Sequence, residues 1–194
     1  MFGIFPVRKS GKLSTGMGGR FHRNVQYLNK FDKVGINKYT DQYKQLIKDN
    51  PDNYEINMAL GLCYLDLKLY DLSCKYFAKV IEQIPDFSDA YYYCALSNIK
   101  GKKIKLITMK ETKYIEQLLH AALQLNPNRS VYYYLYAVIK YEYYLKNGLL
   151  IGSPSIEELL DLGNKNVYEN VEVEKMLELS TIEDEEFISL LRKN

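Results

Sequence analysis

The feature that most constrains the fold of this 194-residue chain is a proline-containing turn that occurs three times. The sequence Asn-Pro-Asp-Asn at 50–53 returns as Ile-Pro-Asp-Phe at 84–87 and as Asn-Pro-Asn-Arg at 126–129, so the prolines are 34 and 42 residues apart. Proline ends a helix and favours a turn, and a period of this length is typical of stacked helix-turn-helix units. The second interval is eight residues longer than the first, and the Lys-rich stretch 100–110 predicts a lengthened loop that accounts for them.

Between these turns, small and large residues recur at fixed spacings. In the first unit, Asn57, Leu60, Gly61 and Tyr64 follow the pattern W-x-x-L-G-x-x-Y with the tryptophan replaced, and Pro85 closes the unit. The remaining positions that match the pattern are Ser73, Phe77, Tyr91, Cys94, Ala95, Ala122, Pro127, Tyr133, Tyr136 and Ala137. The segment from Asn50 to about Lys146 therefore resembles the tetratricopeptide repeat (TPR) family.

The resemblance implies a fold with a simple physical basis. A small residue such as Gly61 lets the two helices of a hairpin approach closely, and large neighbours fill the space to the next hairpin. One hairpin cannot bury its apolar face alone, whereas stacked hairpins can. We therefore expect an all-α fold: a right-handed solenoid of TPR-like helical hairpins with extra C-terminal capping helices.

The pattern weakens toward both ends of the chain, which predicts three segments. Residues 1–20 form a flexible basic N-terminal arm, residues 21–153 a TPR-like helical repeat region, and residues 154–194 acidic C-terminal capping helices. Apolar spacing predicts short helices over 21–31 and 39–47 before the first full unit. Capping-box patterns, Ser155 with Glu158 and Ser180 with Glu183, predict helices from 155 to about 162 and from 182 to 191.

Charge is distributed unevenly along the chain, although 26 basic residues nearly balance 24 acidic ones. Residues 1–50 carry ten basic and three acidic side chains, and residues 154–194 carry four and eleven. Either these oppositely charged ends meet, within one molecule or in a homo-oligomer, or each is solvated separately.

No arrangement of residues typical of a catalytic or metal site is found. His22 and His120 have no Cys or second His at metal-ligand spacing, and the glycine-rich stretch 11–19 lacks a complete phosphate-binding motif. The sequence thus predicts a protein that is not an enzyme and has neither cofactor nor metal. Cys63, Cys74 and Cys94 are an odd set without C-x-x-C spacing, which favours free thiols in a reducing compartment.

Membrane and export signals are not predicted either. The apolar residues 1–7 are followed by Arg8 and Lys9 and are too short for a secretory signal. The longest apolar run is interrupted by Lys140, short of the roughly 18 residues that cross a bilayer. A cytoplasmic location is expected by default.

In TPR solenoids the first helix of each hairpin lines the concave surface, so the resemblance implies a set of partner-binding residues. All are apolar or aromatic: Met58, Leu62, Leu65, Tyr92, Leu96, Ile99, Tyr134, Val138 and Tyr141. Such a groove fits a hydrophobic peptide or helix of another protein, as an adaptor, scaffold or chaperone-like protein would bind it. It is either open or filled by the chain's own terminal segments.

A second hypothesis is binding of nucleic acid. It rests on basic residues in the arm and in the long loop, which could contact phosphates: Arg8, Lys9, Lys12, Arg20, Arg23, Lys102, Lys103 and Lys105. The balanced net charge and the acidic C-terminal segment count against it.

Overall fold

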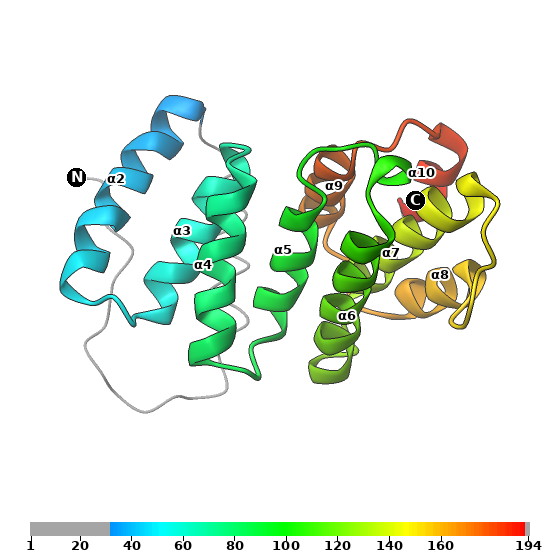
Figure 1. The fold of residues 1–194 in the computed structure, drawn as a ribbon, viewed down its shortest axis with the longest axis horizontal. Helices are drawn as coiled ribbons and strands as arrows, with labels where there is room; N and C mark the ends of the chain where they lie inside the picture. The colour runs from blue at the N-terminus through cyan, green and yellow to red at the C-terminus, as the bar shows by residue number, and fades with distance from the viewer. Residues whose placement is uncertain (1–31, 193–194) are drawn as a thin grey trace.

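The computed structural model describes residues 32–192, and in that range the chain is helical, as Figure 1 shows. The α-helices are α2 (Lys33–Asp49), α3 (Tyr54–Asp66), α4 (Tyr70–Gln83), α5 (Ser88–Asn98), α6 (Met109–Leu125), α7 (Ser130–Ile139), α8 (Ile156–Lys165), α9 (Asn170–Ser180) and α10 (Glu185–Leu191). This confirms the all-α prediction and the helix expected over 39–47. The predicted arm and the helix over 21–31 lie outside the described residues.

Consecutive helices pair into hairpins, and the hairpins stack side by side (Figure 1). Helix α3 packs on α4, α5 on α6 and α7 on α8, while α2 packs on the outer side of α3. Each predicted proline turn lies between two helices, since α3, α5 and α7 begin shortly after it. The stack of TPR-like hairpins is therefore confirmed.

The first helices of the hairpins form the centre of the molecule. Every residue from Ile56 to Leu65 in α3 and from Ser130 to Ile139 in α7 is buried. Helices α4 and α6 bury one face only: α4 packs on α3 and α5, and α6 packs on α5 and α7. A helix buried all round must contact several different elements. The predicted groove residues on these first helices therefore face other parts of the chain.

The small residues of the repeat pattern lie at close helix contacts. A Cβ atom added to Gly61 of α3 would come within 2.5 Å of Phe77 Cε1 on α4, and the Ser73 hydroxyl donates a hydrogen bond to the Gly61 carbonyl at 2.9 Å. In the third hairpin the glycine lies on the second helix and the ring on the first, since Gly163 of α8 packs against the ring of Tyr134 on α7. Helix α8, predicted as part of the cap, thus serves as the second helix of the third hairpin.

The predicted long loop joins α5 to α6. Lys100 and Gly101 have φ values of 57° and 63°, and the loop includes a short 3-10 helix, η1 (Ile104–Leu106). The side chains of Ile104 and Ile107 are buried, which anchors the loop to the core. Thr108 and Glu111 then form a capping box that begins α6.

The C-terminal segment differs in part from its prediction. The capping box of Ser155 and Glu158 is present and begins α8. The box predicted at Ser180 and Glu183 is wrong: Ser180 is the last residue of α9, and Asp184 caps α10 by accepting a hydrogen bond from the Phe187 amide at 3.1 Å. The chain bends between them because Thr181 has a left-handed conformation, with φ 53°. Helix α9 was not predicted.

Candidate functional site: the face covered by the C-terminal helices

The nine predicted partner-binding residues are almost all buried. Eight of them, all except Tyr141, have at most 1 % of their surface exposed: Met58, Leu62, Leu65, Tyr92, Leu96, Ile99, Tyr134 and Val138. Tyr141 is partly buried and lies at the edge of the core. In this conformation, binding of a partner through the eight requires a covering element to move.

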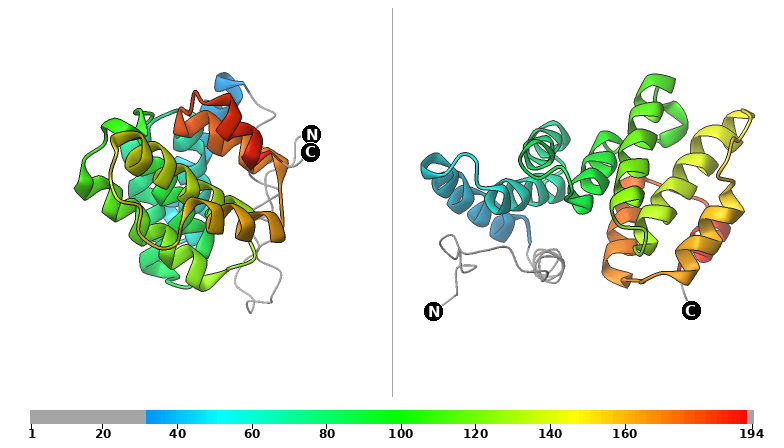
Figure 2. Two further views of the ribbon diagram at one scale, coloured as in Figure 1. Left: turned by 90° about the vertical axis from the view of Figure 1, so that its right-hand side faces the viewer. Right: turned by 90° about the horizontal axis from the view of Figure 1, so that it is seen from below.

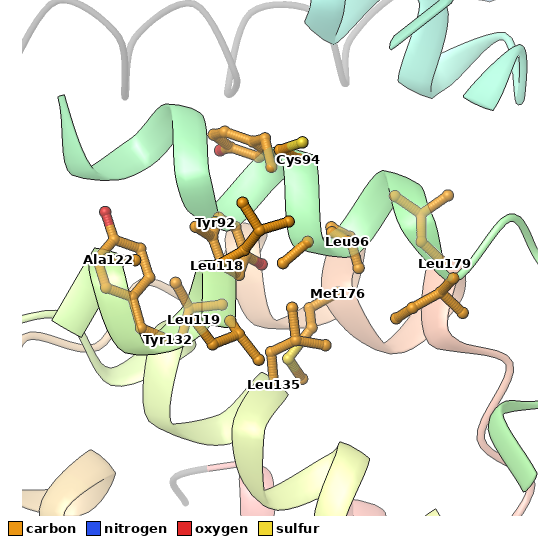
Figure 3. Packing of buried hydrophobic residues seen from close by; sticks show 14 of the residues in the cluster. Tyr92, Cys94, Leu96, Leu118, Leu119, Ala122, Tyr132, Leu135, Met176 and Leu179 are labelled. Atoms are coloured by element: carbon orange, nitrogen blue, oxygen red, sulfur yellow. The ribbon is translucent and has the colours of Figure 1, made fainter. Parts of the chain in front are cut away.

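Helix α9 is the element that covers the part of this face formed by α5 and α7. It contacts both helices, and Figure 2 shows it running beneath them in orange. Its buried side chains include Val173, Met176 and Leu177. Figure 3 shows Met176 close to Leu96 of α5 and Leu135 of α7. Of the two states expected for the groove, the structure shows the one in which the chain's own C-terminal segment fills this part.

The structure does not bring Tyr92 and Tyr134 to one surface. The ring of Tyr92 stacks on Tyr132, with centroids 5.1 Å apart, on the side of α7 that faces α5. Tyr134 packs on Gly163 of α8, and its hydroxyl donates to Asn164 Oδ1 at 2.7 Å. The expectation that both tyrosines line one groove is therefore wrong, because α8 occupies the side of α7 on which Tyr134 lies.

A buried arginine connects α9 to the two hairpins beneath it. Arg129, immediately before α7, is 6 % exposed and forms ion pairs with Glu172 of α9 and, at 3.2 Å, with Glu169. Asp89 of α5 lies 3.9 Å from the same guanidinium. The hydroxyl of Tyr93 donates to Glu172 Oε1 at 3.2 Å. Side chains from α5, α7 and α9 thus share one charged cluster.

Protonation in this cluster follows from burial and charge. Burial alone lowers the pKa of Arg129, but the carboxylates of Glu172 and Asp89 outweigh it and raise the pKa above its usual value. Burial raises the pKa of Tyr93 well above its usual value, and Glu172 adds to that effect. The guanidinium therefore stays charged and the phenol stays a neutral donor.

A second buried ion pair fixes α9 to the first hairpin. Lys175 of α9 pairs with Asp66 at the end of α3, and their side chains are only 6 % and 12 % exposed. Nearby, Lys68 pairs with Glu178 at 3.3 Å, but both of these side chains are largely exposed. Buried pairs lose much more than exposed ones when one partner is removed, so Lys175 is the stronger attachment.

Helix α10 is attached at the other end of the face through Tyr141. The rings of Tyr141 and Phe187 stack with centroids 3.9 Å apart and an interplanar angle of 4°. The Tyr141 hydroxyl donates to Asp184 Oδ2 at 2.5 Å. This hydrogen bond, together with the Phe187 amide, lowers the pKa of Asp184, and it raises the pKa of Tyr141 to about 12. Tyr141 thus joins Tyr134 as a predicted residue that forms a hydrogen bond with the C-terminal segment, and it is the less buried of the two.

Lysines of the long loop also face the acidic segment. Lys103 pairs with Glu183 at 2.8 Å, and the Thr181 hydroxyl donates to the Lys102 carbonyl at 3.0 Å. The Lys102 ammonium in turn pairs with Glu111 at 3.2 Å. Two of the three loop lysines considered for phosphate contacts therefore have a carboxylate beside them, which weakens the nucleic-acid hypothesis. The arginines and lysines of the arm lie outside the described residues.

The acidic C-terminal segment contacts basic residues of the repeat region. Its described partners include Lys68, Lys103 and Arg129, all within residues 51–153. The prediction that it meets the basic N-terminal arm concerns residues the structure does not describe. Within residues 32–192, no group of His, Cys, Asp and Glu side chains could hold a metal ion, and no helix is long and apolar enough to cross a bilayer.

Comparison with known proteins supports the fold. No model of a protein family matches the chain. A solved structure described as "Crystal structure of MamA" is similar, with a TM-score of 0.51 and 17 % identity over 87 % of this chain and 75 % of that one. A second, "MamA MSR-1 C2", has a TM-score of 0.50 and 21 % identity over 81 % and 73 %. MamA is a TPR-repeat protein, so the likeness confirms a TPR-like fold.

Proposed function

From this fold, we propose that the chain is a non-enzymatic protein-binding scaffold, of adaptor or chaperone-like type. It holds a hydrophobic peptide or helix of a partner protein in the groove along the first helices of its hairpins. A TPR-like fold suggests protein-protein interaction in general. The observation that carries the specific proposal is the position of α9, because an amphipathic helix already lies on α5 and α7.

The contacts of α9 define what such a partner must provide. Met176 and Leu177 supply apolar anchors at adjacent positions, with Val173 one turn earlier. Glu172 supplies a carboxylate that pairs with Arg129 and accepts from Tyr93. A partner helix with three apolar residues at this spacing and an acidic residue beside the first would satisfy the same groups. Capture then requires α9 to leave.

A peptide with the sequence of residues 169–181 tests the proposal. We expect weak binding to the wild-type chain, whose groove is occupied. In a full-length Met176→Asp variant, α9 is destabilised because a carboxylate lies in an apolar contact, so we expect the peptide to bind at least about tenfold more tightly. Fluorescence anisotropy of the labelled peptide measures both affinities.

Two controls separate binding in the groove from nonspecific binding. Leu190→Asp changes an exposed residue of α10 and should leave peptide binding as in the wild type. A peptide in which the methionine is replaced by aspartate should not bind the Met176→Asp chain. If that chain keeps its helical circular dichroism and cooperative melting yet does not bind the native peptide, the proposal is wrong.

A further inference from the structure

Two cysteines face one another between the first and second hairpins, away from the groove. Cys74 lies on α4 and Cys94 on α5, both are free thiols, and the two side chains interact. The helices are close at this point, since the Ser73 hydroxyl lies 2.9 Å from the Ser97 hydroxyl. Residues 20 positions apart in sequence thus bring two interacting thiols together where α4 packs on α5.

The two thiols have different surroundings. Cys94 is 2 % exposed, and its sulfur accepts a hydrogen bond from Asn98 Nδ2 at 3.7 Å. Cys74 is only partly buried, so it lies closer to solvent than Cys94 does. Lys100, which pairs with Asp71 at 2.6 Å, lies near enough to act on the Cys74 sulfur.

These surroundings assign a separate role to each sulfur. The interaction with Cys94 lowers the pKa of Cys74 and burial raises it. Lys100 lowers it and the neighbouring Asp71 raises it, and the net effect is a lowered pKa. The same interaction, followed by burial, raises the pKa of Cys94. Cys74, the more exposed of the two, is therefore the thiol that an oxidant meets first, and Cys94 is its buried partner.

We propose that Cys74 and Cys94 form a redox-sensitive pair that closes to an intramolecular disulfide when a hydroperoxide is present. The Cys74 thiolate attacks the distal peroxide oxygen, the O–O bond breaks, and the products are a sulfenic acid and the alcohol or water. The Cys94 sulfur then attacks the Cys74 sulfur, and the sulfenic hydroxyl leaves as water with the Cys94 proton. The protein loses two electrons and the peroxide gains them.

The third cysteine provides an internal control. Cys63 of α3 is fully buried, and burial raises its pKa to about 12, so it is neither accessible nor ionised at neutral pH. The proposed disulfide has a structural consequence of its own, since it links the second helix of one hairpin to the first helix of the next. Oxidation would then fix the packing between two hairpins that share the groove.

Thiol counting on the full-length protein tests the proposal. The folded chain is treated with hydrogen peroxide, quenched with catalase, denatured, alkylated with N-ethylmaleimide and weighed by intact-mass spectrometry. We expect the wild type and Cys63→Ser to lose two alkylation sites without forming dimers, and peptide mapping to find Cys74 joined to Cys94. The Cys74→Ser chain should lose none. The Cys94→Ser chain should hold a sulfenic acid at Cys74 that dimedone labels.

Two results would overturn the proposal. One is a folded wild-type chain that keeps all three alkylation sites under peroxide. The other is oxidation of Cys63 at a rate similar to that of Cys74, or a disulfide between molecules in place of one within them.

Discussion

Two glycines determine how closely the helices of a hairpin approach each other. Gly61 faces the ring of Phe77, and Gly163 faces the ring of Tyr134, and in both cases an added Cβ would overlap the ring. Phe77 cannot move aside easily because it is fully buried and stacks on Tyr93, with centroids 5.6 Å apart. The glycine of the repeat pattern is thus required by packing, since Gly61 has ordinary helical backbone geometry.

The Gly61→Ala substitution should destabilise the chain. Overpacking costs about 1–3 kcal/mol, and the better helix propensity of alanine offsets up to about 1 kcal/mol of this. Urea unfolding followed by circular dichroism measures the difference. Gly152→Ala is the matched control, since an added Cβ there meets nothing within 4 Å. If Phe77→Leu is as costly in the Gly61→Ala background as in the wild type, the proposed overlap is not the cause.

Tyr92 and Tyr134 should behave as core residues. Both are at most 1 % exposed, and we expect each Tyr→Ala change to lower the free energy of unfolding by about 3–5 kcal/mol, as for other large buried rings. Thermal melting checks this. The exposed Tyr114 on α6 is the control, and its change to Ala should leave the melting temperature nearly unaltered. Unchanged melting of the Tyr92→Ala chain would mean that its ring is not packed as described.

At the scale of elements, α9 is held by buried charges as well as by apolar side chains. Removing one member of a buried ion pair leaves an uncompensated charge, whereas replacing both members can be nearly neutral. The pair of Lys175 and Asp66 joins α9 to α3, and the exposed pair of Lys68 and Glu178 lies close by. The two pairs therefore allow a direct comparison.

We expect Lys175→Met to cost about 3 kcal/mol in free energy of unfolding, because the carboxylate of Asp66, whose side chain is 12 % exposed, loses its counter-charge. The double variant Lys175→Met with Asp66→Leu should recover most of that loss. Lys68→Met should change stability by less than about 1 kcal/mol. Denaturant unfolding of the wild type and the three variants measures these free energies. An equal loss of stability in Lys175→Met and Lys68→Met would contradict the argument from burial.

The elements differ in how far the sequence could predict them. The Ser155 box is local, since its partners are three residues apart, and it was predicted correctly. The Ser180 box has the same residues at the same spacing, but Thr181 takes a left-handed conformation and ends α9 there. Helix α9 itself has apolar residues at 173, 176 and 177, a helical spacing that could have been recognised. Its position on α5 and α7 depends on contacts distant in sequence, such as Arg129 with Glu172.

For the whole molecule, the repeat spacing was sufficient to predict the fold but not which surfaces are exposed. The turns at 50–53, 84–87 and 126–129 correctly separate the hairpins. The predicted groove residues follow from a standard TPR surface, in which the concave side is open. Here α8 and α9 pack on α7 from two sides. The unbroken apolar and aromatic run 131–139 indicates a helix that is buried all round, but it does not say which elements cover it. The partner-binding role of the nine residues remains a prediction.

Acid should weaken the attachment of the C-terminal segment. The pKa of Asp184 is lowered from 3.8 by Tyr141 and the Phe187 amide, and that of Glu183 from 4.5 by Lys103. Stability from a carboxyl with a lowered pKa is present above its unfolded pKa and is lost as pH falls through the folded pKa. We expect Asp184→Asn to lower the melting temperature at pH 7 and to make no difference well below pH 3.8.

Asp161→Asn, at an exposed site on α8, controls for the general effect of removing an acidic charge. A melting difference between wild type and Asp184→Asn that stays constant from pH 7 to the acid limit would contradict this assignment.

The backbone just before α9 is tied to the turn between α6 and α7. The Ser130 amide donates to the Val167 carbonyl at 3.1 Å, and the Val167 amide donates to the Asn128 carbonyl at 3.1 Å. A helix anchored this close to its own docking site stays at high effective concentration after each opening. On the proposed function, a partner helix competes with α9, which belongs to the same chain and cannot diffuse away. Ligands of low affinity are then excluded. The association rate of a partner is limited by the rate at which α9 dissociates from α5 and α7.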